Sequence, residues 1–321
     1  AGAVLKQGST VIGVTGGVAD LTSLISNGAI SGLTITPAAN DDTDFTLTVK
    51  ASEKDGTADA YVVTDTVAVT VNAVTDALTF NLSGTTASGN EDTAITLPSV
   101  VSLLTADAGE TLSVTVSGIP TGAVLKDGTT VITVTDGSAT FTSLPTGVLS
   151  ITPPANSKTG FTLTFTGQAK DGDATAVTVA RTVDVTISAV SDTPTITVGA
   201  ATVSATEDTF VTLPTLTPAL TDSSETLTVT LSGIPTGSTL TTSADAAITV
   251  TSGVATLTSG QYAGLKFKAP ANYSGDITLT ATASSKDGSA TAAEHLLFLA
   301  QRLQVVRIQL LHYRVYQVLC W

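Results

Sequence analysis

The chain has 321 residues, of which 42% are apolar and only 4% aromatic, and its formal net charge is −14 at pH 7. That acidic balance argues against nucleic acid as a partner, because phosphates attract a basic face. The single cysteine, Cys320, excludes an intrachain disulfide, and the lack of a long apolar run argues against a membrane span.

Residues 1–75 are predicted to be the C-terminal part of a repeated module. Gly2-Ala-Val-Leu-Lys6 returns 120 residues later as Gly122-Ala-Val-Leu-Lys126, and Lys54-Asp-Gly56 returns 116 residues later as Lys170-Asp-Gly172. A period of this length is a whole domain rather than the short unit of a solenoid. The chain starts inside a repeat and contains no methionine, so we expect it to be a piece of a longer protein.

Residues 76–191 are predicted to be one complete module. In Thr111–Ser117 the apolar side chains all fall on one face and Thr or Ser on the other, as in a half-buried strand. Similar short runs, separated by turn residues, follow the spacing of an antiparallel sandwich; they are 94–97, 111–117, 130–135, 139–142, 149–152, 161–166 and 183–188. The predicted fold class is therefore all-β, with tandem Ig-like or cadherin-like antiparallel β-sandwich domains.

Residues 192–293 repeat the pattern, but the last 28 residues do not. Residues 294–321 lack Thr, Ser, Gly, Asp and Pro, yet they hold both histidines and the only tryptophan. We therefore expect 192–293 to be a sandwich repeat without its last strand, and 294–321 to be an aberrant tail that results from a frameshift or early termination. The alternative is a genuine amphipathic terminal segment.

Acidic residues recur at the turns of every module. They stand in the linker after the last strand, in a Glu-Asp pair, before the alternating strand, and in a Lys-Asp-Gly turn. Such oxygen ligands suit Ca²⁺, which takes about six to eight of them. The candidate ligands are Asp55, Asp76, Glu91, Asp92, Asp107, Glu110, Asp171, Asp192, Glu207, Asp208, Asp222, Glu225 and Asp287. For a single Asp-Gly turn, ordinary turn chemistry is the alternative.

The expected geometry brings several of these acids to one junction between modules. In an immunoglobulin-type sandwich, the first loop between strands lies at the bottom of the domain and the last hairpin at its top. We therefore expect Asp107 and Glu110 at the bottom of the second module, Asp192 in the joint, and Asp287 at the top of the third. The pattern does not assign Glu91 or Glu207 to either end.

Enzymatic chemistry has no support in the repeats. Residues 1–293 contain no His, Cys or Trp, so nucleophilic triads with histidine and zinc sites are excluded there. Gly118-Ile-Pro-Thr-Gly122 and Gly233-Ile-Pro-Thr-Gly237 are interpreted as turns rather than phosphate loops, because no helix is expected to follow them. The sequence therefore predicts that the protein is not an enzyme.

The repeated motifs resemble the cadherin-like and Ig-like repeats of very large bacterial surface adhesins, the RTX-type proteins exported by type I secretion. The resemblance covers residues 1–293 and includes Asn90-Glu-Asp-Thr93, Thr206-Glu-Asp-Thr209, Gly118-Ile-Pro-Thr-Gly122 and Lys170-Asp-Gly172. It implies an extracellular, cell-surface location, extender domains stiffened by calcium, and roles in attachment and biofilm formation. No nonapeptide secretion repeat and no ligand-binding head is recognised.

Taken together, these features predict a structural extender, or stalk, within a calcium-dependent adhesin. Its partners would be neighbouring repeats of the same polypeptide, and domains outside this chain would bind an unknown surface or host ligand. Two alternatives stay open: a module that itself binds glycans or proteins, and an accessory region of a secreted enzyme. Clustered exposed aromatic side chains would favour the first alternative, but the tyrosines are scattered.

Overall fold

A computed structural model describes residues 2–200, 202–206, 208–273 and 275–302. Over these ranges the regular secondary structure is almost entirely β-strand, without an α-helix and with two short 3₁₀ turns, η1 (Thr22–Leu24) and η2 (Ser259–Gln261). The predicted all-β fold class is therefore confirmed. The chain divides into two compact units: the first comprises 1–87, 96–151 and 160–185, and the second comprises 88–95, 152–159 and the residues from 186 onward.

The N-terminal part of the first unit consists of small, open sheets. Strands β2, β1 and β5 form one sheet, β3 pairs with β4, and β6 and β7 form a long hairpin. The bounds are β1 (Val4–Gln7), β2 (Thr10–Val11), β3 (Val14–Thr15), β4 (Val18–Ala19), β5 (Leu33–Thr36), β6 (Phe45–Glu53) and β7 (Tyr61–Val69). None of the described residues before Leu78 is fully buried, so this partial module has no closed core.

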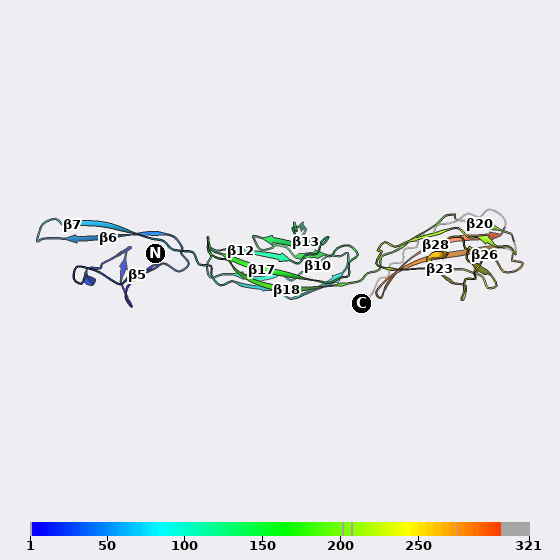
Figure 1. Cartoon of the computed structure of the whole chain (residues 1–321), viewed down its shortest axis with the longest axis horizontal. Coiled ribbons are helices and arrows are strands. Elements are labelled where there is room, and N and C mark those ends of the chain that lie inside the picture. The colour runs from blue at the N-terminus through cyan, green and yellow to red at the C-terminus, as the bar shows by residue number, and fades with distance from the viewer. Residues whose placement is uncertain (1, 201, 207, 274, 303–321) are drawn as a thin grey trace. The chain divides into compact units, whose positions relative to one another are not determined.

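Residues 76–191, the predicted middle module, form two main sheets that face each other (Figure 1). One has the strand order β15-β12-β17-β18-β9 and the other β10-β16-β13-β14, with β11 and β8 as an additional pair. The bounds are β8 (Thr79–Leu82), β9 (Thr86–Asn90), β10 (Ile95–Thr96), β11 (Val100–Leu104), β12 (Thr111–Ser117), β13 (Val124–Asp127), β14 (Thr130–Val131), β15 (Ser138–Phe141), β16 (Leu149–Thr152), β17 (Phe161–Lys170) and β18 (Val177–Ser188).

The core of the middle module is aliphatic, with two phenylalanines at its centre. Phe80, Leu125, Ile151, Leu163 and Phe165 are each at most 1% exposed. The predicted alternation in β12 is present as well, because its valines point into this core while the hydroxyl side chains lie on the other face. The scarcity of aromatic residues in the sequence thus produces a thin interior of Val, Leu and Ile.

The last module, from residue 192, repeats this plan within the second unit. Its sheets have the orders β20-β28-β27-β23-β25 and β21-β26-β24, and β19 pairs with β22. The bounds are β19 (Thr195–Val198), β20 (Thr202–Ala205), β21 (Val211–Thr212), β22 (Leu216–Ala219), β23 (Thr226–Ser232), β24 (Thr239–Thr241), β25 (Ala255–Leu257), β26 (Lys266–Lys268), β27 (Asp276–Asp287) and β28 (Ala290–Arg302).

The final strand of the last module corrects one expectation from the sequence. We expected 192–293 to lack this strand, but β28 pairs antiparallel with β27 along its whole length and parallel with β20. The hairpin forms because ladder hydrogen bonds come from the backbone, and Leu296-Leu-Phe298 consists of residues that a strand accepts. The rest of the expected aberrant tail, 303–321, lies outside the described residues.

The two Gly-Ile-Pro turns are held by a close approach of backbone to backbone. Gly118 and Gly233 have φ of +81° and +82°, and a Cβ on either would lie 2.5 and 2.3 Å from the carbonyl oxygens of Thr162 and Thr278. Only glycine fits such a position. The motif therefore recurs because an equivalent strand, β17 in the middle module and β27 in the last, passes behind each turn.

We expect Gly118→Ala to destabilise the middle module far more than Gly128→Ala. Gly128 also has a positive φ, of +57°, but the nearest atom to its added Cβ would be 3.9 Å away. The control should lose roughly 1–2 kcal/mol from the left-handed backbone, and Gly118→Ala roughly 1–3 kcal/mol more from the clash. Urea denaturation measures both; equal losses would contradict the close approach.

Candidate metal centre

Strand pairing gathers acidic turns at the same end of each module. Strand β12 runs antiparallel to β17 with Thr111 opposite Lys170, and β23 runs antiparallel to β27 with Thr226 opposite Lys286. The acidic turn that precedes β12 or β23 therefore lies beside the Lys-Asp-Gly motif at the end of β17 or β27. Each module thus brings two acidic turns together at one end.

This pairing corrects the predicted placement of Asp107 and Glu110. We expected them at the opposite end of the middle module, where they would meet Asp192 and Asp287. The structure instead places them in the first unit beside Asp171, while Asp192 and Asp287 belong to the second unit. The prediction failed because β12 and β17 are far apart in the sequence. They are not joined by a hairpin, so no local sequence signal indicates that they pair.

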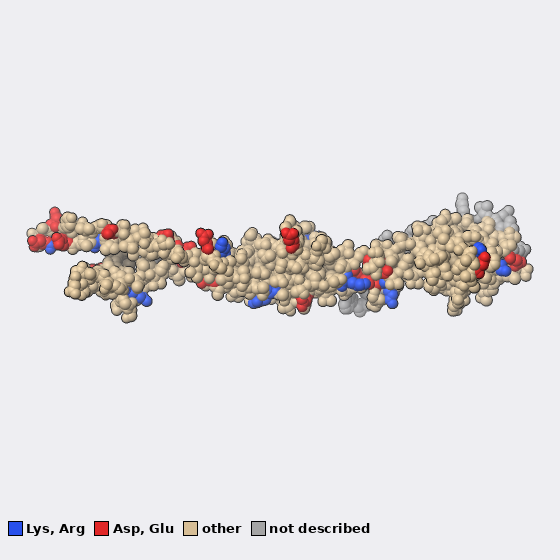
Figure 2. Space-filling view, viewed as in Figure 1, with Lys and Arg blue, Asp and Glu red and all other residues tan. Residues whose placement is uncertain are grey.

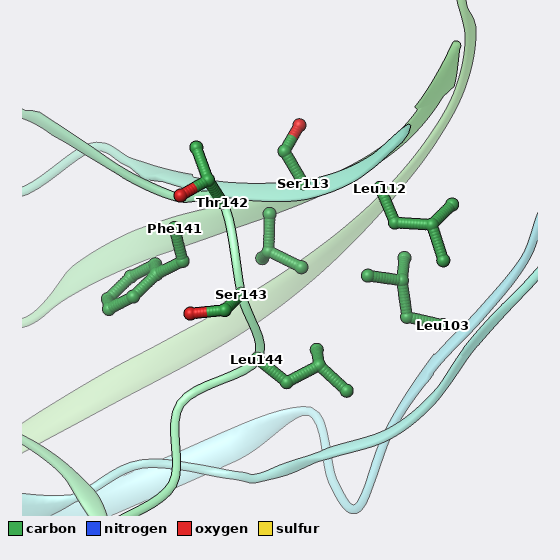
Figure 3. Close-up of a pocket in the computed structure, with 8 residues that line it drawn as sticks. Leu103, Leu112, Ser113, Phe141, Thr142, Ser143 and Leu144 are labelled. Atoms are coloured by element: carbon green, nitrogen blue, oxygen red, sulfur yellow. The ribbon is translucent and has the colours of Figure 1, made fainter. Parts of the chain in front are cut away.

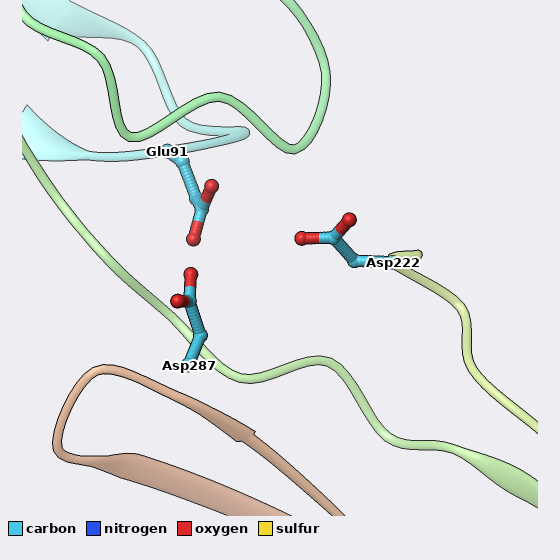
Figure 4. Close-up of side chains that lie close together, drawn as sticks. All are labelled: Glu91, Asp222 and Asp287. Carbon is cyan, nitrogen blue, oxygen red and sulfur yellow. The ribbon is translucent and has the colours of Figure 1, made fainter. Parts of the chain in front are cut away.

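In the second unit, three buried carboxylates converge. Glu91 follows β9 of the middle module, Asp222 precedes β23, and Asp287 ends β27. One oxygen from each lies within 4.8 Å of the others, and the three residues are only 2–3% exposed. Figure 4 shows the carboxylates of Glu91 and Asp287 pointing at each other, with that of Asp222 turned toward them. We call these residues the second-unit cluster.

The linker between the middle and last modules is hydrogen-bonded to this cluster and its neighbours. The backbone N–H of Val190 donates to Glu91 Oε1 at 2.7 Å, and that of Asp192 donates to Glu225 Oε1 at 2.7 Å. The N–H of Asp287 donates to Ser191 Oγ at 2.8 Å. Carboxylates from both modules therefore fix the same short segment of backbone.

Three carboxylates at this linker each have one oxygen without a hydrogen-bond partner among the described residues. Glu91 Oε2, Glu225 Oε2 and Asp287 Oδ2 are buried and accept no hydrogen bond from the described residues. A buried charged oxygen without a partner is costly, because it has lost its hydration. The arrangement therefore lacks positive charge, and a bound cation would supply it.

The pKa shifts reflect the same crowding of negative charge. Burial raises the pKa of Glu91 above its usual range, and the charges of Asp287 and Asp92 raise it further, although the Val190 N–H opposes this. Burial also raises the pKa of Asp192. The pKa of Asp222 is lowered instead, because the backbone N–H and hydroxyl of Ser224 donate to its carboxylate.

One positive side chain reaches the second-unit cluster. Lys158, from the loop between β16 and β17, forms an ion pair through Nζ with Asp287 Oδ1. This pairing raises the pKa of Lys158, and burial opposes it. The ion pair neutralises part of the cluster, but the second oxygen of Asp287 still has no hydrogen-bond partner in the part of the chain that the structure describes.

The first unit contains a matching arrangement of Asp76, Asp107, Glu110 and Asp171, which we call the first-unit cluster. The N–H of Asp76 donates to Glu110 Oε1, and that of Asp171 donates to Thr75 Oγ1 at 3.1 Å. Glu110 is buried, and its Oε2 accepts no hydrogen bond from the described residues. These contacts repeat those of Asp192, Glu225 and Asp287, so linker and turns are organised alike in both units.

Negative charge is also crowded in the first-unit cluster. Burial raises the pKa of Asp171, and the negative charges of Asp42, Asp107 and Glu110 raise it further. Asp107 Oδ1 accepts the N–H of Gly109 at 2.6 Å. Asp42 was not among the candidates from the sequence, because it follows Ala38-Ala-Asn40, which matches the loop Pro154-Ala-Asn156 of the middle module rather than a recurring acidic turn.

The remaining candidate ligands have other surroundings. Asp92 Oδ1 accepts the N–H of Asn156 at 2.8 Å, and Asp208 Oδ1 accepts that of Asn272 at 3.1 Å, so both hold the Pro-Ala-Asn loop. Asp55 is exposed in the turn between β6 and β7. Glu207 lies outside the described residues.

A small pocket in the middle module offers no comparable chemistry. It has a volume of about 200 Å³ and is lined by the apolar and hydroxyl side chains of Leu103, Leu112, Ser113, Val114, Phe141, Thr142, Ser143 and Leu144. Figure 3 shows the leucines and Phe141 around it. The lining of this pocket contains no titratable group.

Charged side chains are sparse on the face of the molecule that Figure 2 shows.

No protein-family model matches the sequence, and no curated protein matches it. Among solved structures, the chain is similar to the protocadherin GammaB4 extracellular domain, with 14% identity and a TM-score of 0.37 over 85% of this chain and 40% of that one. It is also similar to human CDH23 EC21–23, with 16% identity, a TM-score of 0.34, and coverage of 68% and 72%. Mouse Cadherin-23 EC22–24 is similar as well, with 15% identity and a TM-score of 0.32 over 87% of this chain and 81% of that one.

This chain thus spans less than half of the length of the protocadherin domain that it matches. The structural neighbours are tandem extracellular repeats of cadherins. Within the described ranges, no helix is long and apolar enough to cross a membrane.

We expect Ser191→Ala to destabilise the last module, because it removes the acceptor of the buried Asp287 N–H. Such a loss costs roughly 1–3 kcal/mol. Differential scanning calorimetry should show a lower melting temperature than for Ser223→Ala, a change at an exposed serine of the same unit. Identical melting of the two variants would contradict the role given to the linker serine.

Proposed function

We propose that this chain is a run of spacer repeats from an extracellular adhesin, and that Ca²⁺ stabilises the junctions between its modules. The observation that supports this most strongly is a set of buried carboxylate oxygens at the linker, from Glu91, Glu225 and Asp287, that have no hydrogen-bond partner among the described residues. They come from both sides of the linker, so a single cation would bind residues of two modules at once.

The residues that would hold the ion in the second unit are Glu91, Asp222 and Asp287, with Glu225 and Asp192 beside them. Carboxylates and backbone carbonyls are the hard oxygen ligands that Ca²⁺ takes. Binding would cancel the repulsion between the buried charges, which opposes the closed junction when no ion is bound. Because the ligands converge only when the linker is fixed, the ion would favour the ordered junction by binding it preferentially.

Mass action sets the size of this effect. An ion that binds only the ordered state stabilises it by about 2.7 kcal/mol when its free concentration is about 100 times the dissociation constant. That contribution replaces what a disulfide would supply in other extracellular proteins, since the only cysteine is near the chain terminus. Stiff junctions would let many modules carry a binding domain away from a surface.

The assignment to a bacterial surface adhesin rests on the resemblance of the repeated motifs to those of such proteins. Asn90-Glu-Asp-Thr93, Gly118-Ile-Pro-Thr-Gly122 and Lys170-Asp-Gly172 support a bacterial, RTX-type surface adhesin that acts in attachment or biofilm formation. In this proposal the neighbouring repeats are the immediate partners, and the adhesive ligand is bound by other domains of the parent protein. A glycan-binding role has less support, because the described pocket contains a single aromatic ring, that of Phe141.

Calcium should raise the melting temperature of the full chain, and EDTA should lower it. A calcium-bound junction is also expected to keep a larger maximum dimension in small-angle X-ray scattering, because the ordered linker holds neighbouring modules apart. Magnesium at the same concentration is the control, since it accepts fewer protein ligands. If neither melting nor scattering responded to calcium, the spacer proposal would lose its physical basis.

Glu91→Gln should have opposite effects with and without calcium. The amide oxygen can still accept the Val190 N–H, but the charge that burial disfavours is gone. In EDTA the variant should therefore melt above the wild type. In calcium it should lose affinity by about tenfold, as expected for one fewer charged ligand.

The matched control for this charge change is Glu53→Gln, at an exposed position on β6. It alters the net charge equally but touches neither cluster, so both readouts should stay at the wild-type values. A Glu91→Gln variant that behaved like this control in calcium and in EDTA would rule Glu91 out as a ligand.

A further inference from the structure

The two clusters differ at one matching position of the Pro-Ala-Asn loop. In the first unit this loop reads Ala38-Ala-Asn40-Asp-Asp42, and in the middle module it reads Pro154-Ala-Asn156-Ser-Lys158. Asn40 and Asn156 share a left-handed backbone, with φ of 59° and 56°. The loops thus have the same turn, and two residues later one presents a carboxylate and the other an ammonium group.

Lys158 acts directly on the second-unit cluster. Its Nζ pairs with Asp287 Oδ1, while its side chain remains 46% exposed, so the ammonium group reaches the cluster from the solvent side. The negative charges of Glu91 and Asp222 also favour the protonated lysine. All three residues of the cluster therefore attract this one cation, which is already part of the chain.

Asp42 has the opposite effect on the first-unit cluster. A Cβ added at Gly172, in the Lys-Asp-Gly turn, would lie 3.8 Å from Asp42 Oδ2. This carboxylate therefore stands beside the same turn that Lys158 contacts in the other unit. Its charge adds to those of Asp107, Glu110 and Asp171, and the buried Glu110 Oε2 has no partner among the described residues.

We propose that Lys158 is a built-in counter-ion that competes with the divalent cation at its junction, whereas Asp42 makes the first-unit cluster the stronger divalent-cation site. This inference rests on the proposed function, because it grades the affinities of the same two clusters. A divalent ion at the second-unit cluster must displace Lys158 from Asp287 or share that carboxylate with it. At the first-unit cluster, the matching position adds a negative charge instead of a competing positive one.

The consequence is a run of modules whose junctions respond to different calcium concentrations. The junction with Lys158 keeps partial neutralisation when calcium is scarce, whereas the junction with Asp42 has no such ion pair among the described residues. As calcium rises, the first-unit cluster fills first. One exchanged residue in an otherwise repeated loop would thus set where this run of modules is flexible at a given calcium concentration.

Isothermal titration calorimetry with calcium on the full chain tests this grading, with one cluster weakened at a time. Asp171→Asn leaves the second-unit cluster as the main site, and in that background Lys158→Met should tighten binding at least about tenfold. Asp287→Asn leaves the first-unit cluster, and there Asp42→Lys should weaken binding at least about tenfold. Lys126→Met, on β13, is the charge-matched control and should change neither affinity.

The outcomes separate the two levels of the proposal. If no variant binds calcium, the proposed function itself fails. If both clusters bind calcium, but Lys158→Met and Asp42→Lys leave the affinities unchanged, the counter-ion role is overturned while the calcium junctions stand. If Lys158→Met unfolds in EDTA and regains its far-UV circular dichroism with calcium, the counter-ion role is supported, and the Asp42→Lys arm tests it independently of folding.

Discussion

The antiparallel pairing of β12 with β17, and of β23 with β27, is the constraint from which both acidic clusters follow. Because Thr111 faces Lys170 and Thr226 faces Lys286, the turn before one strand and the turn after the other share one end of the sandwich. Two motifs that are about 60 residues apart in the sequence become neighbours. The clusters are therefore products of the sheet register, and the buried aliphatic core maintains that register.

The linker adds the second half of the arrangement. Val190 and Asp192 donate their backbone N–H groups to Glu91 and Glu225, which come from the middle and the last module. Each glutamate accepts a backbone N–H with one oxygen, and its other oxygen is buried without a partner in the described ranges. The structure thus orders the linker at an electrostatic cost, and a cation would remove that cost.

Much of the fold could be predicted from the sequence because its signals are local. Alternation in 111–117, the Gly-Ile-Pro turns and the Lys-Asp-Gly hairpins each depend on a few adjacent residues. The end of the module to which Asp107 belongs could not be predicted, since it depends on which distant strands pair. Glu91 was a candidate without an assigned place, and Lys158 was missed because nothing in a repeated loop marks a single exchanged residue. The strand β28 was missed because its composition, unlike its backbone pairing, breaks the pattern.

Hydrogen exchange at the linker amides is the most direct test of the central claim that calcium orders the junction through Glu91 and Glu225. With calcium bound, the amides of Val190 and Asp192 should exchange more slowly than in EDTA, because the ion would fix the carboxylates that accept them. Core amides of β17 should be unaffected and serve as the internal reference. Equal exchange of the linker amides in calcium and in EDTA, under conditions where calcium binding is measured independently, would contradict the account.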